Sequence, residues 1–434
     1  MATSRLLVDD GVIVISPEGN LVLDIRQEES EEQYSYRVKS GTLRANSRYF
    51  DNLLSDRFSE GQSLLAALEH LKISGHEDVA GALVGVLPRI RIINVGKIGI
   101  SKGSNIQNLT ADFLRAIHGQ PLAVAVPPVS NLANLAVLAD RFDAVESLAI
   151  YVQRRKYLLA TDAKSKSKTG SSIPEERVRQ KLLVGLLFDH PPWVTRYSKH
   201  LIMRDSAQWQ PGVETDDSKA LWWDLPYGIE DELIQRREYI LETINSIQSH
   251  FLKLYTSGER QCKLGYDTSR ECDSYQLGEM VRFFIKTSTL RLQGTIYDNT
   301  EPTYYSGDLD RLLESLRQCS SYQIDRNHAH CGLRSRMIPL LDLVQNQLSL
   351  EIGSLDIGIC AECWKNNRGV YAWSLAKRPV MAPPRLLTVS RPNGNSHGAG
   401  HQRSLSSSSC LNRHILVREF YMATEKNWAA RDAY

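Results

Sequence analysis

The chain has 434 residues, and its 52 basic and 50 acidic side chains give a formal net charge of +2. Its hydrophobic fraction of 42% and charged fraction of 24% are those of a folded protein and exclude a fully disordered chain. The near-neutral charge gives no general attraction to nucleic acid or anionic lipid, and the length predicts two domains.

The N-terminus lacks the features of a secretory signal. Asp9 and Asp10 interrupt the apolar stretch that a signal peptide would continue. No apolar run approaches the roughly 20 residues that are needed to cross a bilayer. We therefore expect an intracellular protein, cytoplasmic or nuclear, that does not associate with membranes.

The first elements form a small mixed domain. Residues 20–25 and 33–39 alternate between apolar and polar side chains, which predicts a β-hairpin. Helical spacing follows in residues 42–54 and again in residues 62–71. Residues 89–93, RIRII, then predict another strand.

Two more helices close this region. One runs from residue 105 or 110 to residue 118 and ends before Gly119 and Pro121, which are typical residues after a helix. Residues 130–153 have the clearest helical pattern, and we expect them to form one helix with a buried stripe. The members of that stripe are Leu132, Leu135, Leu138, Phe142, Val145, Leu148, Ala149 and Val152.

The remainder is predicted to be mainly helical, with a flexible end. Residues 161–172 contain no large apolar side chain and are interpreted as part of a linker. Residues 229–255 place Leu233, Ile240, Ile244, Ile247 and Phe251 along one stripe, and residues 340–350 repeat the pattern. After residue 377, Pro, Ser and Gly dominate, so we expect disorder.

Several separated motifs resemble BTB/POZ domains, in particular those of fungal proteins. The segment YRVKSGTLRANSRYFDNLLSDRFSEG is similar to the BTB segment in which a second strand leads into a helix that begins with a leucine, followed by a Phe-Ser-Glu turn. DFLRAIHG and NLANLAVLADRFD are similar to later helices of these domains. Asp24 matches an acidic position of the first strand, whereas Lys39 stands where many BTB domains have His. The matching positions in the first segment are Leu43, Ser47, Tyr49, Phe50, Phe58, Ser59 and Glu60.

The resemblance implies a BTB/POZ-like N-terminal domain. Together with the helical spacing and the Ser- and Gly-rich composition that follow, it predicts an α+β fold with a mainly helical C-terminal domain and a disordered tail. BTB domains are interaction modules without catalytic residues, so we expect a non-enzymatic adaptor that binds protein partners. Some BTB domains bind cullin-type ubiquitin-ligase scaffolds, but the signature of that role has no convincing counterpart between residues 94 and 118. The predicted segments are a BTB/POZ-like domain (15–157), a linker (158–173), a mainly helical domain (174–376) and a largely disordered tail (377–434). A short helix at residues 416–430 that forms on a partner is the alternative for the end of the tail.

The cysteines concentrate in one part of the chain. All seven lie in residues 262–410, and their odd number argues against a disulfide framework. Cys360 and Cys363 form a CxxC pair, a spacing at which two thiolates reach one zinc ion from a tight turn. This pair would supply half of a tetrahedral zinc site.

The second half is expected from a nearby segment. Cys331 and either His328 or His330 lie close together in sequence and offer a thiolate and an imidazole. Cys262 and Cys272 are the reserve pair. The sequence thus predicts one structural zinc ion, with plain structural thiols as the alternative. Its expected ligands are Cys331, His328 or His330, Cys360 and Cys363.

Other functions have weaker support. The run GKIGISKG lacks the spacing of a phosphate-binding loop, and the chain has no G-x-S-x-G motif of serine hydrolases. The alternative function is that of a zinc-binding regulatory protein with nucleic-acid contacts through Arg154, Arg155, Lys156 and the lysines that follow. A solvated linker explains that basic stretch more simply, so we expect no nucleic-acid partner.

Overall fold

The computed structural model divides into two compact units. Unit 1 contains Met1–Val194 and Thr215–Pro226, and unit 2 contains Thr195–Glu214 and Tyr227–Tyr434. The described residues are 8–26, 33–73, 82–93, 95, 98–99, 105–166, 173–213, 219–262, 269–289, 305–328, 331–349, 356–381 and 407–428.

Unit 1 begins with a five-stranded sheet of order β1-β2-β4-β3-β5. Strands β3 (Leu21–Arg26) and β4 (Gln33–Val38) pair antiparallel, which confirms the predicted hairpin. Strand β5 (Arg89–Ile93) runs parallel to β3, and β2 (Val12–Val14) runs parallel to β4. The edge strand β1 (Val8–Asp9) pairs with β2. The sheet is therefore mixed, and strand β3, which lies between β4 and β5, is buried on both faces.

A buried carboxylate ties three of these strands together. Asp24 on β3 accepts a hydrogen bond from the Ser35 hydroxyl on β4 at 2.6 Å. The same oxygen of Asp24 pairs with Arg89 on β5 at 3.1 Å. The acidic position noted in the sequence thus has a structural role in strand pairing.

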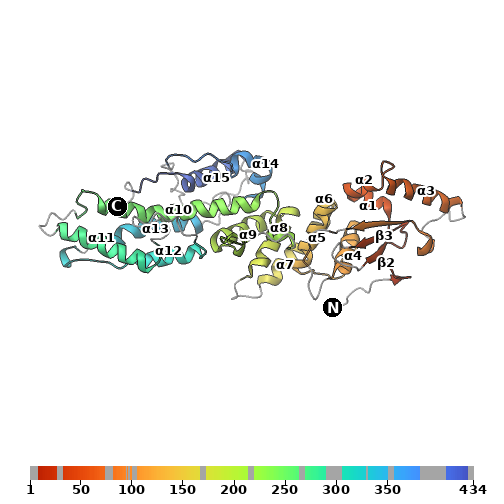
Figure 1. Ribbon diagram of the computed structural model, residues 1–434, viewed down its shortest axis with the longest axis horizontal. Coiled ribbons are helices and arrows are strands. Elements are labelled where there is room, and N and C mark those ends of the chain that lie inside the picture. Colours follow the sequence, from red (N-terminus) through yellow and green to blue (C-terminus); the bar gives the residue numbers. More distant parts are fainter. Residues whose placement is uncertain are drawn as a thin grey trace, which may run out of the picture. The chain divides into compact units, whose positions relative to one another are not determined.

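Helices cover the sheet and extend unit 1 (Figure 1). The Phe142 ring lies 5.3 Å from both the Phe50 and the Phe113 ring, so one aromatic group joins three helical segments. The helices are α1 (Ser40–Asn46), α2 (Arg48–Leu53), α3 (Ser59–Ile73), α4 (Ile106–Ile117), α5 (Val129–Arg141), α6 (Val145–Arg154), α7 (Tyr157–Lys166) and α8 (Glu175–Leu187), with short 3₁₀ turns at Val84–Val86 and Leu221–Trp223.

Three sequence predictions differ from the structure of unit 1. The helix expected at residues 42–54 is divided into α1 and α2, because Ser47 between them has an extended backbone. The single helix expected at residues 130–153 is split into α5 and α6, because Asp143 has a positive φ of 44°. The break exposes carbonyls that bind the start of α2: Ser47 donates to the Phe142 carbonyl and the Arg48 N–H to that of Asp143.

The first part of the predicted linker is also helical, since residues 158–166 belong to α7. Asp162 on α7 accepts a hydrogen bond from Trp193 Nε1 at 2.7 Å and pairs with Lys181 at 3.4 Å. These two contacts stabilise α7 against its neighbours. Residues 167–172 of the linker lie outside the described residues.

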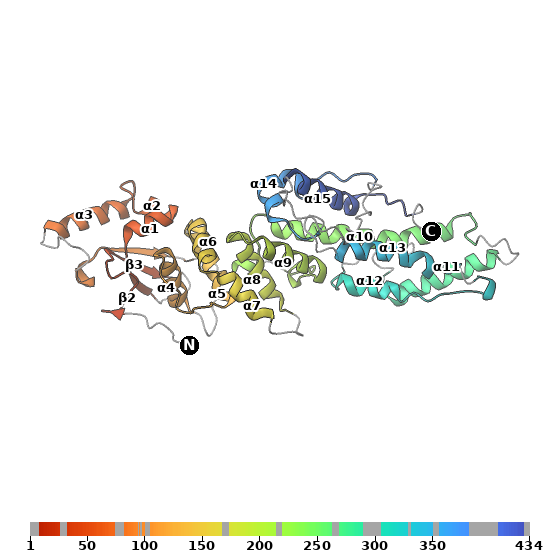
Figure 2. The ribbon, with the colours of Figure 1, turned by 180° about the vertical axis from the view of Figure 1, so that it is seen from behind.

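Unit 2 is built around one long helix, α10 (Ile229–Thr256), whose predicted stripe is fully buried. Figures 1 and 2 show α11, α12 and α13 along one side of α10 and α14 and α15 along the other. None of the helices in the described ranges is long and apolar enough to cross a membrane. The other helices are α9 (Pro191–Arg204, which begins in unit 1), α11 (Ser269–Lys286), α12 (Leu309–Arg317), α13 (Leu333–Ser349), α14 (Ala361–Tyr371) and α15 (Ser407–Met422), with 3₁₀ turns at Ala207–Trp209 and Arg326–His328.

The predicted disordered tail is wrong for residues 407–428. Ser407–Met422 form α15, and the rings of Tyr421 and Trp373 stack with their centroids 5.7 Å apart. Thr243 on α10 donates a hydrogen bond to the Tyr421 carbonyl at 3.2 Å. The alternative helix at residues 416–430 overlaps α15 but begins nine residues too late, because the Ser-rich run hides the start of α15. Residues 382–406 lie outside the described residues.

Candidate metal centres

Four side chains of unit 2 meet at a group that we call centre A: Cys262, Cys272, His328 and Cys331. Their ligand atoms all lie within 4.8 Å of one another. The Cys262 Sγ is 3.4 Å from Nδ1 of His328 and 3.5 Å from the Cys331 Sγ. The Cys331 Sγ is 3.8 Å from the same Nδ1. Three thiols and one imidazole thus surround a common point.

These distances suit a tetrahedral ion. Zinc binds sulfur at about 2.3 Å and nitrogen at about 2.0 Å, so neighbouring ligand atoms lie about 3.5–3.8 Å apart. The three distances measured in centre A are 3.4, 3.5 and 3.8 Å. The spacing of Cys262, His328 and Cys331 therefore fits a single zinc ion, and the Cys272 Sγ lies within 4.8 Å of all three ligand atoms.

Backbone contacts hold the ligands of centre A in place. Asp273, next to Cys272 on α11, accepts the backbone N–H of Cys262 at 2.9 Å and that of Gln261 at 2.8 Å. The Tyr255 hydroxyl, on α10, donates to the Cys331 carbonyl at 3.3 Å. Centre A is thus held between the end of α10, the start of α11 and the turn before α13.

A second group, which we call centre B, consists of Cys360, Cys363, Cys410 and His414. Cys360 is the residue before α14 and Cys363 lies in its first turn, whereas Cys410 and His414 lie one turn apart on α15. The ligand atoms again lie within 4.8 Å of one another, and the sulfurs of Cys363 and Cys410 are 3.9 Å apart. Centre B therefore joins α14 to α15.

The imidazole of centre B is well buried. His414 is 4% exposed, and its Nε2 has no hydrogen-bond partner among the described residues. The His414 ring meets the Tyr371 ring edge-on, with centroids 5.2 Å apart and planes at 82°. Burial, together with the charges of Arg236 and Arg413, lowers the pKa of His414 to about 4. The imidazole is therefore neutral at pH 7, which is the state that binds metals.

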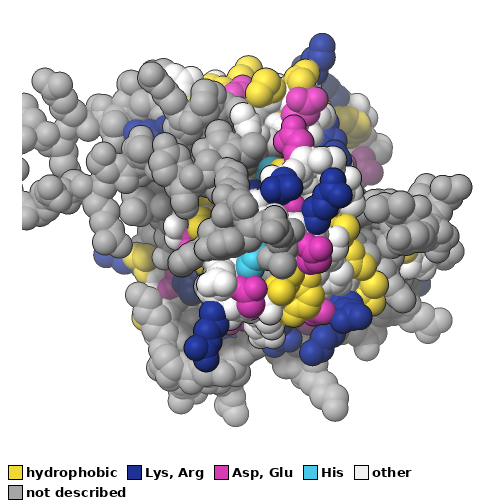
Figure 3. Space-filling model, turned by 90° about the vertical axis from the view of Figure 1, so that its left-hand side faces the viewer, with side chains coloured by type: hydrophobic (Ala, Val, Ile, Leu, Met, Phe, Trp, Pro, Cys, Tyr) yellow, Lys and Arg dark blue, Asp and Glu magenta, His cyan; other side chains and the backbone are white. Residues whose placement is uncertain are grey.

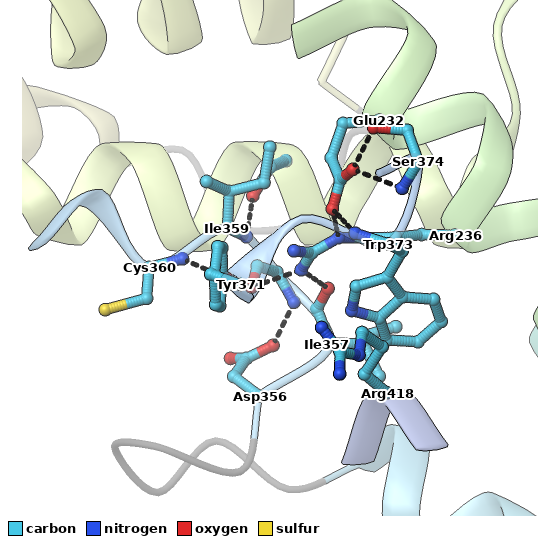
Figure 4. A network of polar contacts seen from close by, with 12 residues as sticks. Glu232, Arg236, Asp356, Ile357, Ile359, Cys360, Tyr371, Trp373, Ser374 and Arg418 are labelled. Atoms are coloured by element: carbon cyan, nitrogen blue, oxygen red, sulfur yellow. Dashed lines mark hydrogen bonds and ion pairs between the residues drawn. The ribbon is translucent and has the colours of Figure 1, made fainter. Parts of the chain in front are cut away.

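A buried ion pair supports the segment that carries Cys360 (Figure 4). Arg236 on α10 pairs with Glu232 at 2.8 Å and donates to the carbonyls of Ile357 at 2.8 Å and Gly358 at 3.0 Å. Glu232 accepts the backbone N–H groups of Trp373 at 2.9 Å and Ser374 at 3.0 Å. Both ends of α14 are thus tied to α10 by one pair of charges (Figure 4).

Burial affects the thiols in both centres. It raises the pKa of Cys331 to about 11 and also raises the pKa values of Cys272, Cys363 and Cys410. A bound cation would favour the thiolate, because metal ligation requires the deprotonated form. Metal binding must therefore release protons from these thiols.

The structure pairs the predicted ligands differently from the sequence prediction. Cys360 and Cys363 lie in centre B, whereas His328 and Cys331 lie in centre A. The two predicted halves therefore belong to different centres, and His330 lies outside the described residues.

The ligands that complete centre A precede its predicted pair in the sequence, whereas those that complete centre B follow theirs. The reserve pair, Cys262 and Cys272, completes centre A. Cys410 and His414 complete centre B and were missed because they lie in the predicted tail. A Cys-x-x-x-His spacing, with both side chains on one helical face, was the available signal. The seventh cysteine, Cys319, is buried outside both groups.

Comparisons with models of known families, with curated proteins and with solved structures found no match.

Proposed function

We propose that this chain is a non-enzymatic interaction protein whose unit 2 folds around two structural zinc ions, one in each centre. The observation that carries the proposal is the pair of Cys₃His groups. Soft thiolate ligands with one imidazole favour zinc over magnesium or calcium, which prefer oxygen. Four protein ligands leave no open position for an activated water, so both ions would have a structural role.

Each zinc ion would connect segments that are distant in sequence. Centre A joins α11 to the turn before α13, and centre B joins α14 to α15. Six of the seven cysteines belong to these groups, and none forms a disulfide. This use of thiols suits a compartment that keeps them reduced, so we propose an intracellular location.

We propose that residues 20–153 form an interaction module of the BTB/POZ type. The similar sequence motifs support this, and so does the order of elements, with a hairpin, two short helices, a third helix, a parallel strand and three further helices. Leu43, Phe50, Leu135, Leu138 and Phe142 are each at most 1% exposed, which fits their proposed role in packing. Partner contacts would therefore come from other residues of unit 1.

The end of unit 2 that faces the viewer in Figure 3 carries charges of both signs on its described side chains (Figure 3). On that face, Lys and Arg side chains lie among Asp and Glu side chains, with small hydrophobic groups between them (Figure 3). A nucleic-acid site would be expected to gather basic side chains in one patch or stripe. Salt-dependent DNA binding by the full chain would favour the alternative regulatory role.

Elemental analysis of the full chain tests the zinc proposal. Protein purified without chelators should contain about two zinc ions per chain, because structural zinc is held tightly. Less than about a tenth of an equivalent would overturn the proposal.

Cross-linking followed by mass spectrometry tests the interaction role. Partner cross-links should map to residues 20–153, and reproducible partners found only on unit 2 would contradict that assignment.

A further inference from the structure

Both centres share an arrangement outside the four ligands. In each, a tyrosine hydroxyl bonds the backbone of a ligand cysteine, and an arginine lies over the ring of that tyrosine. Tyr255 donates to the Cys331 carbonyl at 3.3 Å, with the Arg336 guanidinium carbon 5.9 Å from its ring centroid. Tyr371 accepts the Cys360 N–H at 2.8 Å, with the Arg236 guanidinium carbon 5.0 Å from its ring centroid.

The contacts of Tyr371 are the more extensive. Its hydroxyl also donates to the Gly358 carbonyl at 3.4 Å, so one oxygen fixes the backbone on both sides of Ile359. Its ring packs against His414. Tyr371 therefore contacts the backbone of one ligand of centre B and the side chain of another.

Tyr371 is in turn fixed by α10. Arg236 lies between the Tyr371 and Trp373 rings, with its guanidinium carbon 5.0 and 5.1 Å from their centroids. Tyr371 is 1% exposed and Arg236 is 1% exposed, so neither side chain has room to change its rotamer freely. The phenol is thus held in position before any metal binds.

We propose that Tyr371 is a positioning residue that sets the metal affinity of centre B, and that Tyr255 has the same role in centre A. This inference rests on the proposed zinc sites. Groups that orient metal ligands commonly change metal affinity about 10–100-fold when they are removed. Because the Tyr371 hydroxyl makes two hydrogen bonds to the backbone and the Tyr255 hydroxyl makes one, removing the Tyr371 hydroxyl should have the larger effect.

The test uses Tyr371→Phe and Tyr255→Phe in the full chain. Each substitution keeps the ring and removes the hydroxyl. Zinc affinity is measured by competition with a chromophoric chelator. To assign each centre, the same substitutions are made in a Cys262→Ser, Cys272→Ser background, which retains centre B, and in a Cys360→Ser, Cys363→Ser background, which retains centre A.

Tyr371→Phe should weaken zinc binding at centre B about 10–100-fold and leave centre A within about two-fold of wild type. Tyr255→Phe should do the reverse, with a smaller change. Cobalt(II) spectra provide a second readout, because the thiolate bands of centre B should change only in Tyr371→Phe. This spectral change should persist at saturating cobalt. A defect in folding alone would instead be reversed by the bound metal at that concentration.

Unchanged affinity and spectra at centre B in Tyr371→Phe would overturn the inference while leaving the proposed function intact. Equal weakening of both centres would also overturn it, because a general loss of stability would then explain the effect. A wild-type protein that binds no zinc would overturn both proposals. Circular dichroism at saturating zinc verifies that each variant is folded.

Discussion

The two candidate centres have the same donor set but are assembled in different ways. Centre B combines two close pairs, a CxxC before and within α14 and a Cys-x-x-x-His on α15. Centre A combines one close pair, His328 and Cys331, with Cys262 and Cys272, which lie ten residues apart. A close pair can be identified from spacing alone, but the fold decides which pair it meets.

The centres also differ in burial. In centre A only Cys331 is partly exposed, whereas in centre B both Cys360 and Cys410 are. A solvent-exposed thiolate is more accessible to chelators and oxidants. Centre B should therefore exchange its metal faster than centre A.

Removing both zinc ions should have the largest effect on stability, and this effect should be confined to unit 2. Structural zinc contributes about 10–16 kcal/mol of apparent binding free energy in small zinc-dependent peptides. Exhaustive chelation should therefore abolish or strongly lower the calorimetric transition of unit 2. The transition of unit 1, whose core includes Phe50, Phe113 and Phe142, should stay at its original temperature. Identical calorimetric traces with and without chelator would contradict a structural role for the metal.

Removing one ligand residue should affect only the centre to which that residue belongs. Cys410→Ser should loosen α15 and leave α11 protected, whereas Cys272→Ser should do the opposite, because each residue belongs to one centre. Hydrogen exchange followed by mass spectrometry measures both helices in one experiment. The matched control is Cys319→Ser, which removes a buried thiol outside both groups and should retain both zinc ions. Equal loss of protection in both helices from either ligand variant would contradict two independent centres.

The pH dependence of zinc binding should be set by the deprotonation of the thiols. Burial raises the pKa values of Cys363 and Cys410, so both are protonated at pH 7 without metal, and zinc must displace these protons. Affinity at centre B should therefore fall as pH is lowered, with about two or more protons released per zinc. Because His414 has a pKa of about 4, it should add no further proton between pH 5 and pH 7. Calorimetric titrations in buffers of different ionisation enthalpy measure this number, and an additional proton below pH 6.5 would contradict the assignment.

The smallest effect is expected from a cap in unit 1. The Ser47 hydroxyl caps α2 by accepting the Phe50 N–H at 3.1 Å and donates to the Phe142 carbonyl at 2.5 Å. Ser47→Ala should lower the free energy of unfolding of unit 1 by about 0.5–2 kcal/mol. The exposed Ser63→Ala on α3 is its control and should change that free energy by less than about 0.5 kcal/mol. Loss of zinc from Ser47→Ala would show that the units are not energetically separate.

Local patterns predicted the elements of this fold well. The hairpin at β3 and β4, strand β5 and the buried stripe of α10 follow from alternation or helical spacing, which are properties of short segments. The break between α5 and α6 could not be predicted in this way. Its apolar spacing continues across Asp143, and the positive φ is stabilised by contacts with α2, which is distant in sequence.

The metal ligands show the same limit. Sequence spacing identified the pair Cys360 and Cys363 and the pair His328 and Cys331. It wrongly assigned both pairs to one site, whereas they belong to different centres. The correct partners depend on the docking of α15 and on the contact between Asp273 and the Cys262 backbone. Such long-range contacts leave no periodic signal in the sequence, and the Ser-rich run before α15 obscured the last two ligands.

Native mass spectrometry of the full chain tests the central claim most directly, because it counts bound ions. The wild type should carry two zinc ions, and the Cys262→Ser, Cys272→Ser and Cys360→Ser, Cys363→Ser variants should each carry one. The variant with all four substitutions should carry none. A wild type with one zinc ion that is lost on mutation of Cys360 and Cys363, but kept on mutation of Cys262 and Cys272, would contradict two separate centres. That result would instead support the single site predicted from the sequence.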